Sequence, residues 1–455
     1  MAKSSQRIHF IAIGGSVMHN MAIALHQMGD VISGSDDEIF EPSRSRLKAH
    51  GLLPAKEGWD KANITSDLDA VIVGMHARED NPELLEAQSK GIKVYSFPEY
   101  IYEHAEDKQR VVIAGSHGKT TITSIIMHVL KYFDRKFDYA VGAHINGFDT
   151  MVRLSDAPII IIEGDEYLAA PTDRTPKFLK YHHHIGLISG IAWDHINVFP
   201  NEDEYTKQFE IFADATPKGG SLAYCEEDAM ATVIGNKERE DVHRLTYQTH
   251  PHMIENGITY LTNGNDKIHI KLFGKHNLQN ISGAKEVLKK IGISEDQFYQ
   301  AIPSFEGADK RLELVADKPR TTIFKDYAHA PSKVKATTLA VKEQYPEREL
   351  VACLELHTFS SLTKEFLNEY SGTMKYANLP VVYFNPLTIE HKNLDPISAE
   401  DIKSAFEESR LQVFDNSDEL MAFLKSQDWS DKNLLMMSSG TFNSMDFDDI
   451  AKSIG

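Results

Sequence analysis

The sequence predicts an α/β protein with mainly parallel sheets. A unit of strand, loop and helix recurs along the chain, in three successive blocks. Several of the strands are continuous apolar runs, such as residues 158–162 and 187–191. Continuous runs are typical of parallel strands that helices cover on both faces. With 455 residues, the chain is long enough for about two to four domains.

The first block begins with an apolar strand at residues 8–13, followed by Gly14-Gly15-Ser16 and a helical pattern. A second strand follows and ends at Ser35-Asp36. This order resembles a Rossmann βαβ unit, but the full glycine fingerprint is missing. The loop therefore fits a dinucleotide or a nucleotide diphosphate. Strands at 70–73 and 94–96 continue the sheet, and the charged stretch 103–110 predicts a linker.

The second block contains a loop typical of nucleotide triphosphate binding. An apolar strand ends at Ala114 and a helical pattern starts at Ile122. Between them lie Gly115, Ser116, His117, Gly118, Lys119, Thr120 and Thr121. Lys119 is expected to reach the β- and γ-phosphates, and the Thr120 hydroxyl to bind Mg²⁺. The usual phosphate loop has a glycine where this chain has Ile113, so an ordinary βα turn is the alternative.

Acidic and histidine residues follow two further strands of this block. Glu163 ends the first strand, and Asp194-His195 follows the second. Because parallel strands present their carboxyl ends at one edge, these residues should lie near Lys119. Glu163 is the expected Mg²⁺ ligand, unless it only caps a helix. His195 is either a second metal ligand or a residue that orients phosphate. The tract 182–184 predicts a polar loop rather than a metal site.

The third block predicts a separate five-stranded sheet beyond a boundary near residue 315. Its strands are expected at 321–325, 350–354, 380–384, 411–414 and 434–437. Before it, Asn277 and Asn280 share a helix face and fit either an adenine edge or a helix cap. Arg311 fits a phosphate or a surface salt bridge. Asp326, at a strand end, fits ribose hydroxyls, and His329 an acidic substrate or phosphate.

Composition excludes several classes of protein. The net charge of −19 argues against broad binding to nucleic acid or anionic membranes. Cys225 and Cys353 lie far apart in apolar runs, which predicts buried thiols in a reducing compartment. The first strand is too short for a signal peptide or a membrane span. We therefore expect a cytoplasmic protein with no membrane or nucleic-acid partner.

The motifs, in this order, resemble the Mur ligase family, the ATP-dependent amide-forming enzymes of peptidoglycan assembly. The resemblance covers nearly the whole chain. Its elements are Gly14-Gly15 with Ser35-Asp36, the loop 115–121, the run 163–167, Asp194-His195, His276-Asn277 with Asn280, the run 310–313 and the run 326–331. The family implies a Rossmann-like domain at 1–108, a central P-loop ATP-binding domain at 109–314 and a Rossmann-like domain at 315–455.

The resemblance also implies a set of ligands and residue roles. The first domain would bind the uridine nucleotide of a UDP-muramoyl substrate through Gly14, Gly15, Ser16, Ser35, Asp36 and His76. ATP would contact the loop 115–121, His276, Asn277, Asn280, Arg311 and Asp326. Lys119, Glu163 and His195 would be catalytic, and Thr120, Glu163 and His195 would hold Mg²⁺. His329 would face the incoming amino acid or peptide. The family pattern implies a monomer or a weak homodimer.

Two branches of the family add to the lactyl carboxylate of UDP-N-acetylmuramate. The run ending in Asp165-Glu166-Tyr167 resembles the recycling branch, which attaches the tripeptide L-alanyl-γ-D-glutamyl-meso-diaminopimelate. The branch that attaches L-alanine usually has Asp-Glu-Ser there, and it is the alternative. Gly164 replaces a usual alanine, Ala330 replaces a usual histidine, and the run 358–361 lacks the expected arginine. A folylpolyglutamate-synthetase-like ligase and a nucleotide-dependent switch are more distant alternatives.

Overall fold

The computed structural model describes residues 5–193, 198–308 and 311–454. Contacts between residues divide the chain into two compact units. Of the described residues, the first unit takes 5–193, 198–248 and 283–298, and the second takes 249–282 and those of 299–454. The predicted domain boundaries near residues 108 and 314 stay predictions. Each unit is described by itself below.

The first unit begins with a four-stranded parallel sheet in the order β2-β1-β3-β4. Its strands are β1 (Arg7–Ile11), β2 (Val31–Ser35), β3 (Ala70–Val73) and β4 (Lys93–Ser96). The helices that accompany them are α1 (Ser16–Gln27), α2 (Ser43–Ala49), α3 (Pro82–Ser89) and α4 (Phe97–Glu103). The sequence pattern predicts all four strands, because each is a short apolar run followed by a turn or helix signal.

The predicted linker at 103–110 is wrong in its second half. Lys108 is buried, and its ammonium group lies 3.1 Å from the Asp138 carboxylate. Arg110 is also buried and donates to the carbonyl oxygens of Ala105 and His182, at 2.7 and 2.9 Å. Lys108 thus pairs with a carboxylate and Arg110 with backbone carbonyl groups. This stretch therefore packs into the unit instead of lying in solvent.

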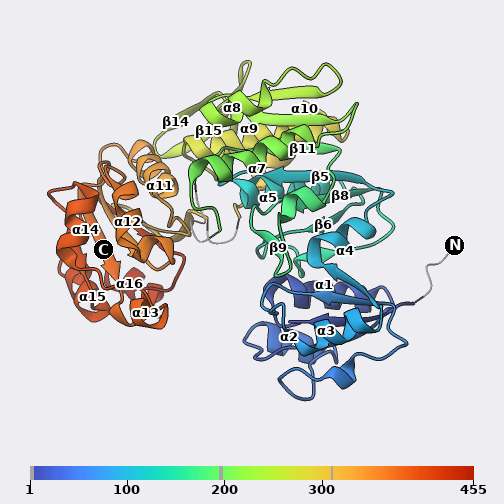
Figure 1. The fold of residues 1–455 in the computed structure, drawn as a ribbon. Coiled ribbons are helices and arrows are strands. Elements are labelled where there is room, and N and C mark those ends of the chain that lie inside the picture. Colours follow the sequence, from blue (N-terminus) through green and yellow to red (C-terminus); the bar gives the residue numbers. More distant parts are fainter. Residues whose placement is uncertain (1–4, 194–197, 309–310, 455) are drawn as a thin grey trace. The chain divides into compact units, whose positions relative to one another are not determined.

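The same unit contains a seven-stranded sheet in the order β13-β12-β11-β5-β8-β6-β7 (Figure 1). Its strands are β5 (Gln109–Ala114), β6 (Asp138–Ala140), β7 (Val152–Arg153), β8 (Ile159–Glu163), β11 (Ile185–Ile188), β12 (Ser221–Cys225) and β13 (His243–Tyr247). All neighbours pair in parallel except β6 and β7. The helices of this part are α5 (Lys119–Tyr132), α6 (Lys177–Lys180), α7 (Glu202–Asp214) and α8 (Ala229–Gly235). A short hairpin is formed by β9 (Leu168–Ala170) and β10 (Asp173–Pro176).

The second unit combines a small antiparallel sheet with a larger one. The small sheet consists of β14 (His252–Glu255), β15 (Ile258–Asn263) and β16 (Asp266–Ile270). None of these three strands was predicted from the sequence. Helices α9 (Lys275–Lys290) and α10 (Glu295–Ala301) follow, and both contribute residues to each unit.

The larger sheet has six strands in the order β17-β18-β22-β19-β20-β21. They are β17 (Glu313–Lys318), β18 (Thr321–Asp326), β19 (Glu349–Leu356), β20 (Leu379–Phe384), β21 (Gln412–Phe414) and β22 (Lys432–Met437). Its helices are α11 (Pro331–Gln344), α12 (Lys364–Leu367), α13 (Pro386–His391), α14 (Ala399–Phe406), α15 (Ser417–Lys425) and α16 (Phe447–Ser453). The five predicted strands are present. The sixth, β17, is an antiparallel edge strand that the prediction missed, because an edge strand need not be apolar.

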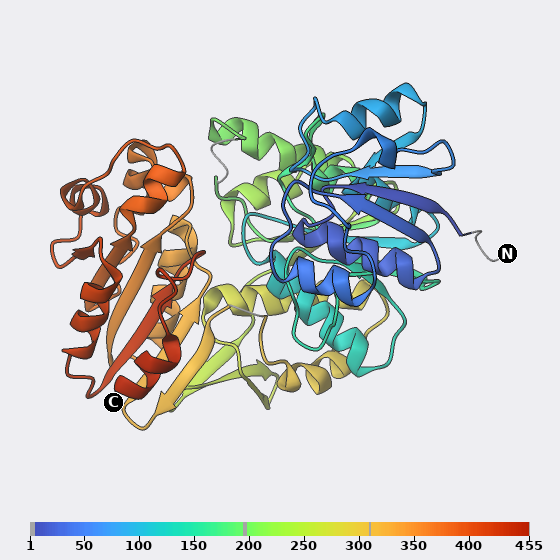
Figure 2. The same ribbon diagram turned by 90° about the horizontal axis from the view of Figure 1, so that it is seen from below.

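Helices cover both faces of this sheet, as Figure 2 shows for the orange and red part of the chain. Along β19, Ala352 and Leu354 belong to one apolar cluster, whereas Val351 and Cys353 belong to another. Since successive side chains of a strand point to opposite faces, each cluster is the core on one side. The α/β fold class is confirmed, and both cysteines are free and buried, as predicted. Among the described residues, none of the helices has the length and apolar character needed to cross a lipid bilayer.

Candidate active site

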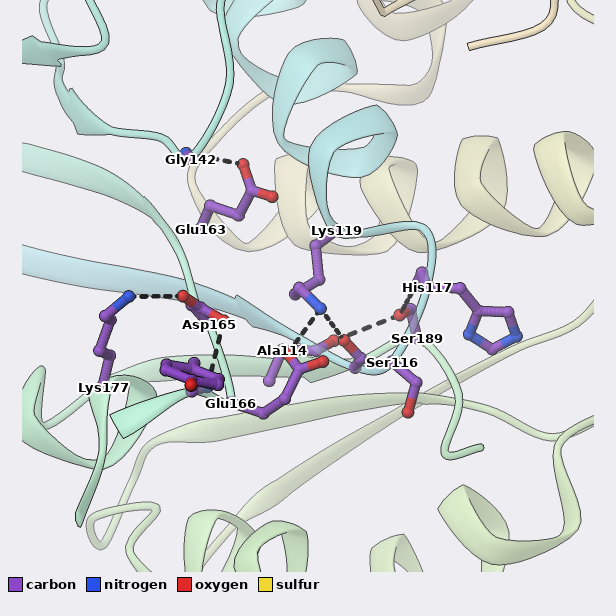
Figure 3. Close-up of polar contacts among 12 residues, drawn as sticks. Ala114, Ser116, His117, Lys119, Gly142, Glu163, Asp165, Glu166, Lys177 and Ser189 are labelled. Atoms are coloured by element: carbon purple, nitrogen blue, oxygen red, sulfur yellow. Dashed lines mark hydrogen bonds and ion pairs between the residues drawn. The ribbon is translucent and has the colours of Figure 1, made fainter. Parts of the chain in front are cut away.

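The phosphate loop joins β5 to α5 and is braced by the segment after β11. Gly115 and Gly118 have φ angles of +132° and +81°, which favour glycine. A Cβ on Gly115 would lie 2.1 Å from the Ser189 hydroxyl oxygen. That hydroxyl donates to the carbonyl oxygen of His117 (Figure 3). These two glycines and the Ser189 hydrogen bond therefore fix the shape of the loop, with the first turn of α5 at its end.

Lys119 makes a buried ion pair at the start of α5. Its ammonium group lies 2.6 Å from the Glu166 carboxylate and also donates to the Gly115 carbonyl (Figure 3). The exposed fraction of the Glu166 side chain is 2%. Burial alone would lower the pKa of Lys119, but the charges of Glu166, Asp165 and Glu163 raise it above its usual value. The lysine is thus a firmly protonated cation at the predicted phosphate position.

Thr120 and Glu163 meet beside this lysine, as the sequence predicts. The Thr120 hydroxyl donates to one Glu163 carboxylate oxygen over 2.7 Å, and the Gly142 N–H donates to the other over 3.0 Å. Two hard oxygen donors at the end of a phosphate loop fit Mg²⁺, which completes its shell with phosphate and water oxygens. The predicted third ligand, His195, lies outside the described residues. The described residues contain no group of three His, Cys, Asp or Glu side chains that could hold a metal ion.

Residues far away in the sequence position Ser116 and Glu166. The hydroxyl groups of Ser116 and Tyr205 lie 2.7 Å apart, and Ser116 accepts the N–H of Ala192 over 2.9 Å. Tyr205 also donates to Glu166, over 3.3 Å. Sequence reasoning missed Tyr205, which lies on α7 and has no signal of its own. The acidic run after β8 pointed toward Glu166, but the sequence does not show that Tyr205 contacts this residue.

Close packing explains why position 164 holds a glycine. A Cβ at this position would lie 2.8 Å from the Val112 side chain, 3.1 Å from the Ile113 carbonyl oxygen and 3.1 Å from the Phe178 Cβ. The neighbouring segment is fixed by Lys177, whose ammonium group lies 2.7 Å from Asp165. The close packing of β8 against β5 therefore leaves no room for the alanine usual in the family pattern.

The predicted uridine site lies where β1 and β2 end. The Gly14 N–H donates to the Asp36 carboxylate over 2.7 Å. Burial raises the pKa of Asp36 to about 6, although the Gly14 hydrogen bond and the nearby His76 oppose the rise. Gly15 precedes α1, and Ser16 begins that helix. These residues form one cluster at the sheet edge.

Ser35 differs from the other residues of this cluster. Its side chain is buried, and its hydroxyl donates to Glu83 in the interior of the domain. Glu83 also lies 3.3 Å from His9, and both side chains are fully or almost fully buried. The hydroxyl of Ser35 thus belongs to an internal network rather than to the sheet edge.

The second unit carries the predicted adenine-binding residues on the first turns of α9. Asn277 and Asn280 are buried, and Asn277 donates to the Phe273 carbonyl over 3.0 Å. Burial lowers the pKa of His276 to about 4, so its ring is neutral near pH 7. Its Nδ1 is buried and finds no hydrogen-bond partner in the described part of the chain. An unpaired ring nitrogen beside two amides suits a ligand that donates or accepts hydrogen bonds.

The same unit places Arg311, Asp326 and His329 near one another. The guanidinium of Arg311 lies 4.7 Å from the ring centre of Tyr327, and the His329 ring nitrogen lies 2.9 Å from the Tyr327 carbonyl oxygen. Asp326 accepts the N–H groups of Leu312 and Ala328, over 3.1 and 2.8 Å. Burial raises the pKa of Asp326, and Arg311 opposes the rise. The Asp326 carboxylate is thus already bound to two backbone groups at the end of β18.

Comparisons with known proteins decide the family. Residues 7–109 match the Mur ligase family catalytic domain, 113–288 the Mur ligase middle domain and 310–440 the Mur ligase glutamate ligase domain. UDP-N-acetylmuramate–L-alanine ligase of Caldicellulosiruptor bescii is 30% identical over 404 residues, which cover 86% of each chain. The chain belongs to the Mur ligase family. This Mur ligase is accordingly an ATP-dependent amide ligase, as predicted.

Further relatives of this Mur ligase come from both predicted branches. UDP-N-acetylmuramate–L-alanine ligase of Carboxydothermus hydrogenoformans is 27% identical over 461 residues, covering 98% of this chain and 96% of its own. The structure of UDP-N-acetylmuramate–alanine ligase from Thermotoga maritima has a TM-score of 0.69 at 19% identity, covering 98% and 97% of the two chains. A murein peptide ligase from Psychrobacter arcticus has a TM-score of 0.64 at 20% identity, covering 99% and 98%. The two structures share the fold, whereas the sequence relatives carry the name of the alternative branch.

Proposed function

We propose that this Mur ligase joins L-alanine to the lactyl carboxylate of UDP-N-acetylmuramate, with ATP as the energy source. The observation that carries the ATP-dependent chemistry is the cluster of Lys119, Thr120 and Glu163 at the carboxyl edge of the central sheet. The sequence relatives of nearly equal length are named for this reaction. The acceptor therefore differs from the tripeptide that the sequence motifs favoured.

The chemistry follows from the low reactivity of a carboxylate. A carboxylate oxygen of the substrate attacks the γ-phosphorus of ATP, the bond to the β,γ-bridging oxygen breaks, and ADP leaves. The neutral amine of the acceptor then attacks the acyl carbon, the bond from that carbon to the phosphate oxygen breaks, and the nitrogen loses a proton as the amide forms and phosphate leaves. The first step brings two anions together, so its transition state requires positive charge at the γ-phosphate.

Lys119 is the cation that this chain provides for that step. It is held protonated by its acidic neighbours, and its ammonium group lies at the start of α5. To bind a phosphate oxygen, it exchanges the Glu166 carboxylate for another anion. The lysine thereby keeps an anionic partner, and Glu166 keeps the hydrogen bond from the Tyr205 hydroxyl. Thr120 and Glu163 would hold Mg²⁺, which supplies further charge neutralisation when bound.

The other predicted residues are assigned to the uridine nucleotide, to ATP, to the metal ion and to the acceptor. Gly14, Gly15, Ser16, Asp36 and His76 bind the uridine nucleotide in this proposal. Asn277, Asn280 and His276 bind adenine, Asp326 binds ribose, and Arg311 binds phosphate. His195 would complete the metal site, and His329 would face the acceptor. Ser35 is the weakest of the assignments, since its hydroxyl is used within the domain.

The tripeptide remains a second candidate acceptor because the run Asp165-Glu166-Tyr167 resembles the recycling branch, and because Ala330 replaces a histidine usual in the alanine-adding branch. The segment after β19 reads His357-Thr358-Phe359-Ser360-Ser361 and lacks the arginine of the expected family pattern. Phe359 is 45% exposed at this sheet end. The tripeptide is therefore tested beside L-alanine.

A coupled assay of ADP release separates the two acceptors. The purified protein receives UDP-N-acetylmuramate, ATP and Mg²⁺, with L-alanine or with the tripeptide. Turnover with L-alanine at a kcat/KM at least about tenfold above that with tripeptide supports the proposal. The reverse ratio replaces it with the recycling reaction. ATP binding without ADP release in the presence of either acceptor would contradict both candidate reactions. It would favour a nucleotide-dependent switch.

A further inference from the structure

A cavity of about 670 Å³ lies in the first unit, away from the loops discussed above. Its lining comes from the last turns of α1, the end of α5 and the chain between β6 and β7. Cavities of this size accommodate small organic ligands. No role has been assigned above to any residue that lines it.

The cavity is separate from both predicted nucleotide loops. Lys131, which lines it, lies twelve residues after Lys119 on α5, and an α-helix rises 1.5 Å per residue. The two lysines are therefore about 18 Å apart along the helix axis. The same holds for α1, which begins at Ser16 and contributes Gln27 to the cavity. A ligand in this cavity would bind at the opposite ends of both helices.

The lining is basic in a protein whose net charge is −19. Four cations, Lys131, Arg135, Lys136 and Arg153, accompany Asp134 and Asp149, which leaves a net charge of +2. Lys131 donates to the Gly147 carbonyl over 2.6 Å. Arg135 makes one long bond to Gly292, at 3.5 Å.

Lys136 and Arg153 differ from Lys131 and Arg135 in the contacts that their side chains make. Within the described residues, neither side chain has an ion pair or a hydrogen bond. Both are exposed, and both line the cavity. Ammonium and guanidinium groups at the rim of one cavity can both donate hydrogen bonds to the same anion. These two side chains are therefore available to an anionic ligand.

Aromatic side chains form another part of the lining. The rings of Phe137, Tyr139 and Phe148 pack together, with centroids 5.4 to 6.3 Å apart. Phe148 is the ring that remains half-exposed, and the Lys131 ammonium lies 5.0 Å from its centre. Tyr139 adds a hydroxyl group 3.2 Å from that of Thr150. Exposed aromatic faces beside cations are the elements that proteins use for a planar base and its phosphate.

We propose that this cavity binds a nucleoside monophosphate. The phosphate lies between Lys136 and Arg153, whose charges match its two negative charges, and the base lies against Phe148. Since the lining comes from α1 and from the central sheet's β6–β7 segment, the bound nucleotide would contact both parts of the first unit. The proposal does not depend on which acceptor the ligase uses.

Isothermal titration calorimetry with GMP tests this proposal. Guanine differs from the uracil and adenine expected at the other two sites, and GMP is titrated with no other nucleotide present, so that none competes for the cavity. The wild-type protein is expected to bind GMP, and Lys136→Glu/Arg153→Glu is expected to bind it at least about tenfold more weakly, because reversed charges repel phosphate. Phe148→Ala should weaken GMP binding and leave ADP binding unchanged.

The control variant is Lys48→Glu/Lys403→Glu. It makes the same change in net charge at two exposed lysines that do not line the cavity. GMP affinity should stay within about twofold of wild type, and urea unfolding should show that both double variants are folded. Equal weakening in both double variants, or no weakening in Lys136→Glu/Arg153→Glu, would overturn the proposal. Inorganic phosphate binding as tightly as GMP would overturn the role of Phe148.

Discussion

Replacing Lys119 should affect both folding and catalysis, because the lysine is one half of a buried ion pair. At 2.6 Å and an effective dielectric constant of about 20, the attraction between Lys119 and Glu166 is about 6 kcal/mol before desolvation is subtracted. Removing one partner of such a pair costs about 3–5 kcal/mol of unfolding free energy. Lys119→Met leaves the Glu166 carboxylate with the Tyr205 hydroxyl, at 3.3 Å. We expect this variant to lose about 3–5 kcal/mol.

The double variant Lys119→Met/Glu166→Gln isolates the interaction. Glu166→Gln removes the negative charge but keeps an oxygen for Lys119, and it should cost about 1–3 kcal/mol. The double variant buries no charge, so its loss should fall short of the sum of the single losses by about 2–4 kcal/mol. Urea unfolding of the four proteins provides the measurement. Strictly additive losses would refute a direct ion pair.

Lys177→Met is the matched control, since Lys177 also pairs with a carboxylate after β8. Its partner, Asp165, is 40% exposed, so solvent screens this pair. Its loss should cost at most about 1 kcal/mol. ADP formation separates the two lysines further: Lys119→Met should be slower by at least about 10²-fold, because it lacks a cation at the transferred phosphoryl group. Wild-type ADP formation in Lys119→Met would exclude the proposed role.

The pH dependence of this difference follows from the direction of the pKa shift. The pKa of Lys119 is raised in the folded protein. Its contribution to stability is therefore fully present below the unfolded value of about 10.4, and is lost as the pH rises through the folded pKa. The stability difference between wild type and Lys119→Met should therefore not decline from pH 6 to 9. A decline within that range would contradict the raised pKa.

Three other substitutions test the packing and charges around the loops. Gly164→Ala should cost about 1–3 kcal/mol in urea unfolding, since its Cβ would lie 2.8 Å from Val112; unchanged stability would show that β8 has room. Gly115→Ala should weaken ATP binding in calorimetry, because φ is +132° and Ser189 blocks the Cβ; wild-type affinity would contradict this. The raised pKa of Asp36, about 6, favours its protonated form in the folded state. Compared with Asp36→Asn, wild type should therefore gain unfolding free energy between pH 7.5 and 5, and a constant difference would refute the shift.

Much of the candidate site could be predicted because it depends on strand ends. Thr120 and Glu163 are 43 residues apart, yet both follow strands of one parallel sheet. Continuous apolar runs reveal those strands, and the parallel arrangement then brings their carboxyl ends to one edge. The same logic placed Gly14 beside Asp36 in the first sheet.

The remaining contacts depend on side-chain packing that no local pattern encodes. Ser116 meets Tyr205 across 89 residues, and Lys119 meets Glu166 across 47. Glutamate side chains are mostly solvent-exposed in proteins, and only the fold of this chain buries Glu166. Strand β17 was missed for a related reason, since its charged and apolar residues suit an edge and do not form a continuous apolar run.

Asp326 links a ligand site to the course of the main chain. Its carboxylate holds the N–H of Leu312, a residue in the left-handed backbone conformation just before β17. If ribose hydroxyls bind to this carboxylate, they share it with the residue at which the chain enters the sheet. A nucleotide bound there would then compete with the Leu312 N–H for the Asp326 carboxylate. A change in this hydrogen bond would therefore report nucleotide binding directly.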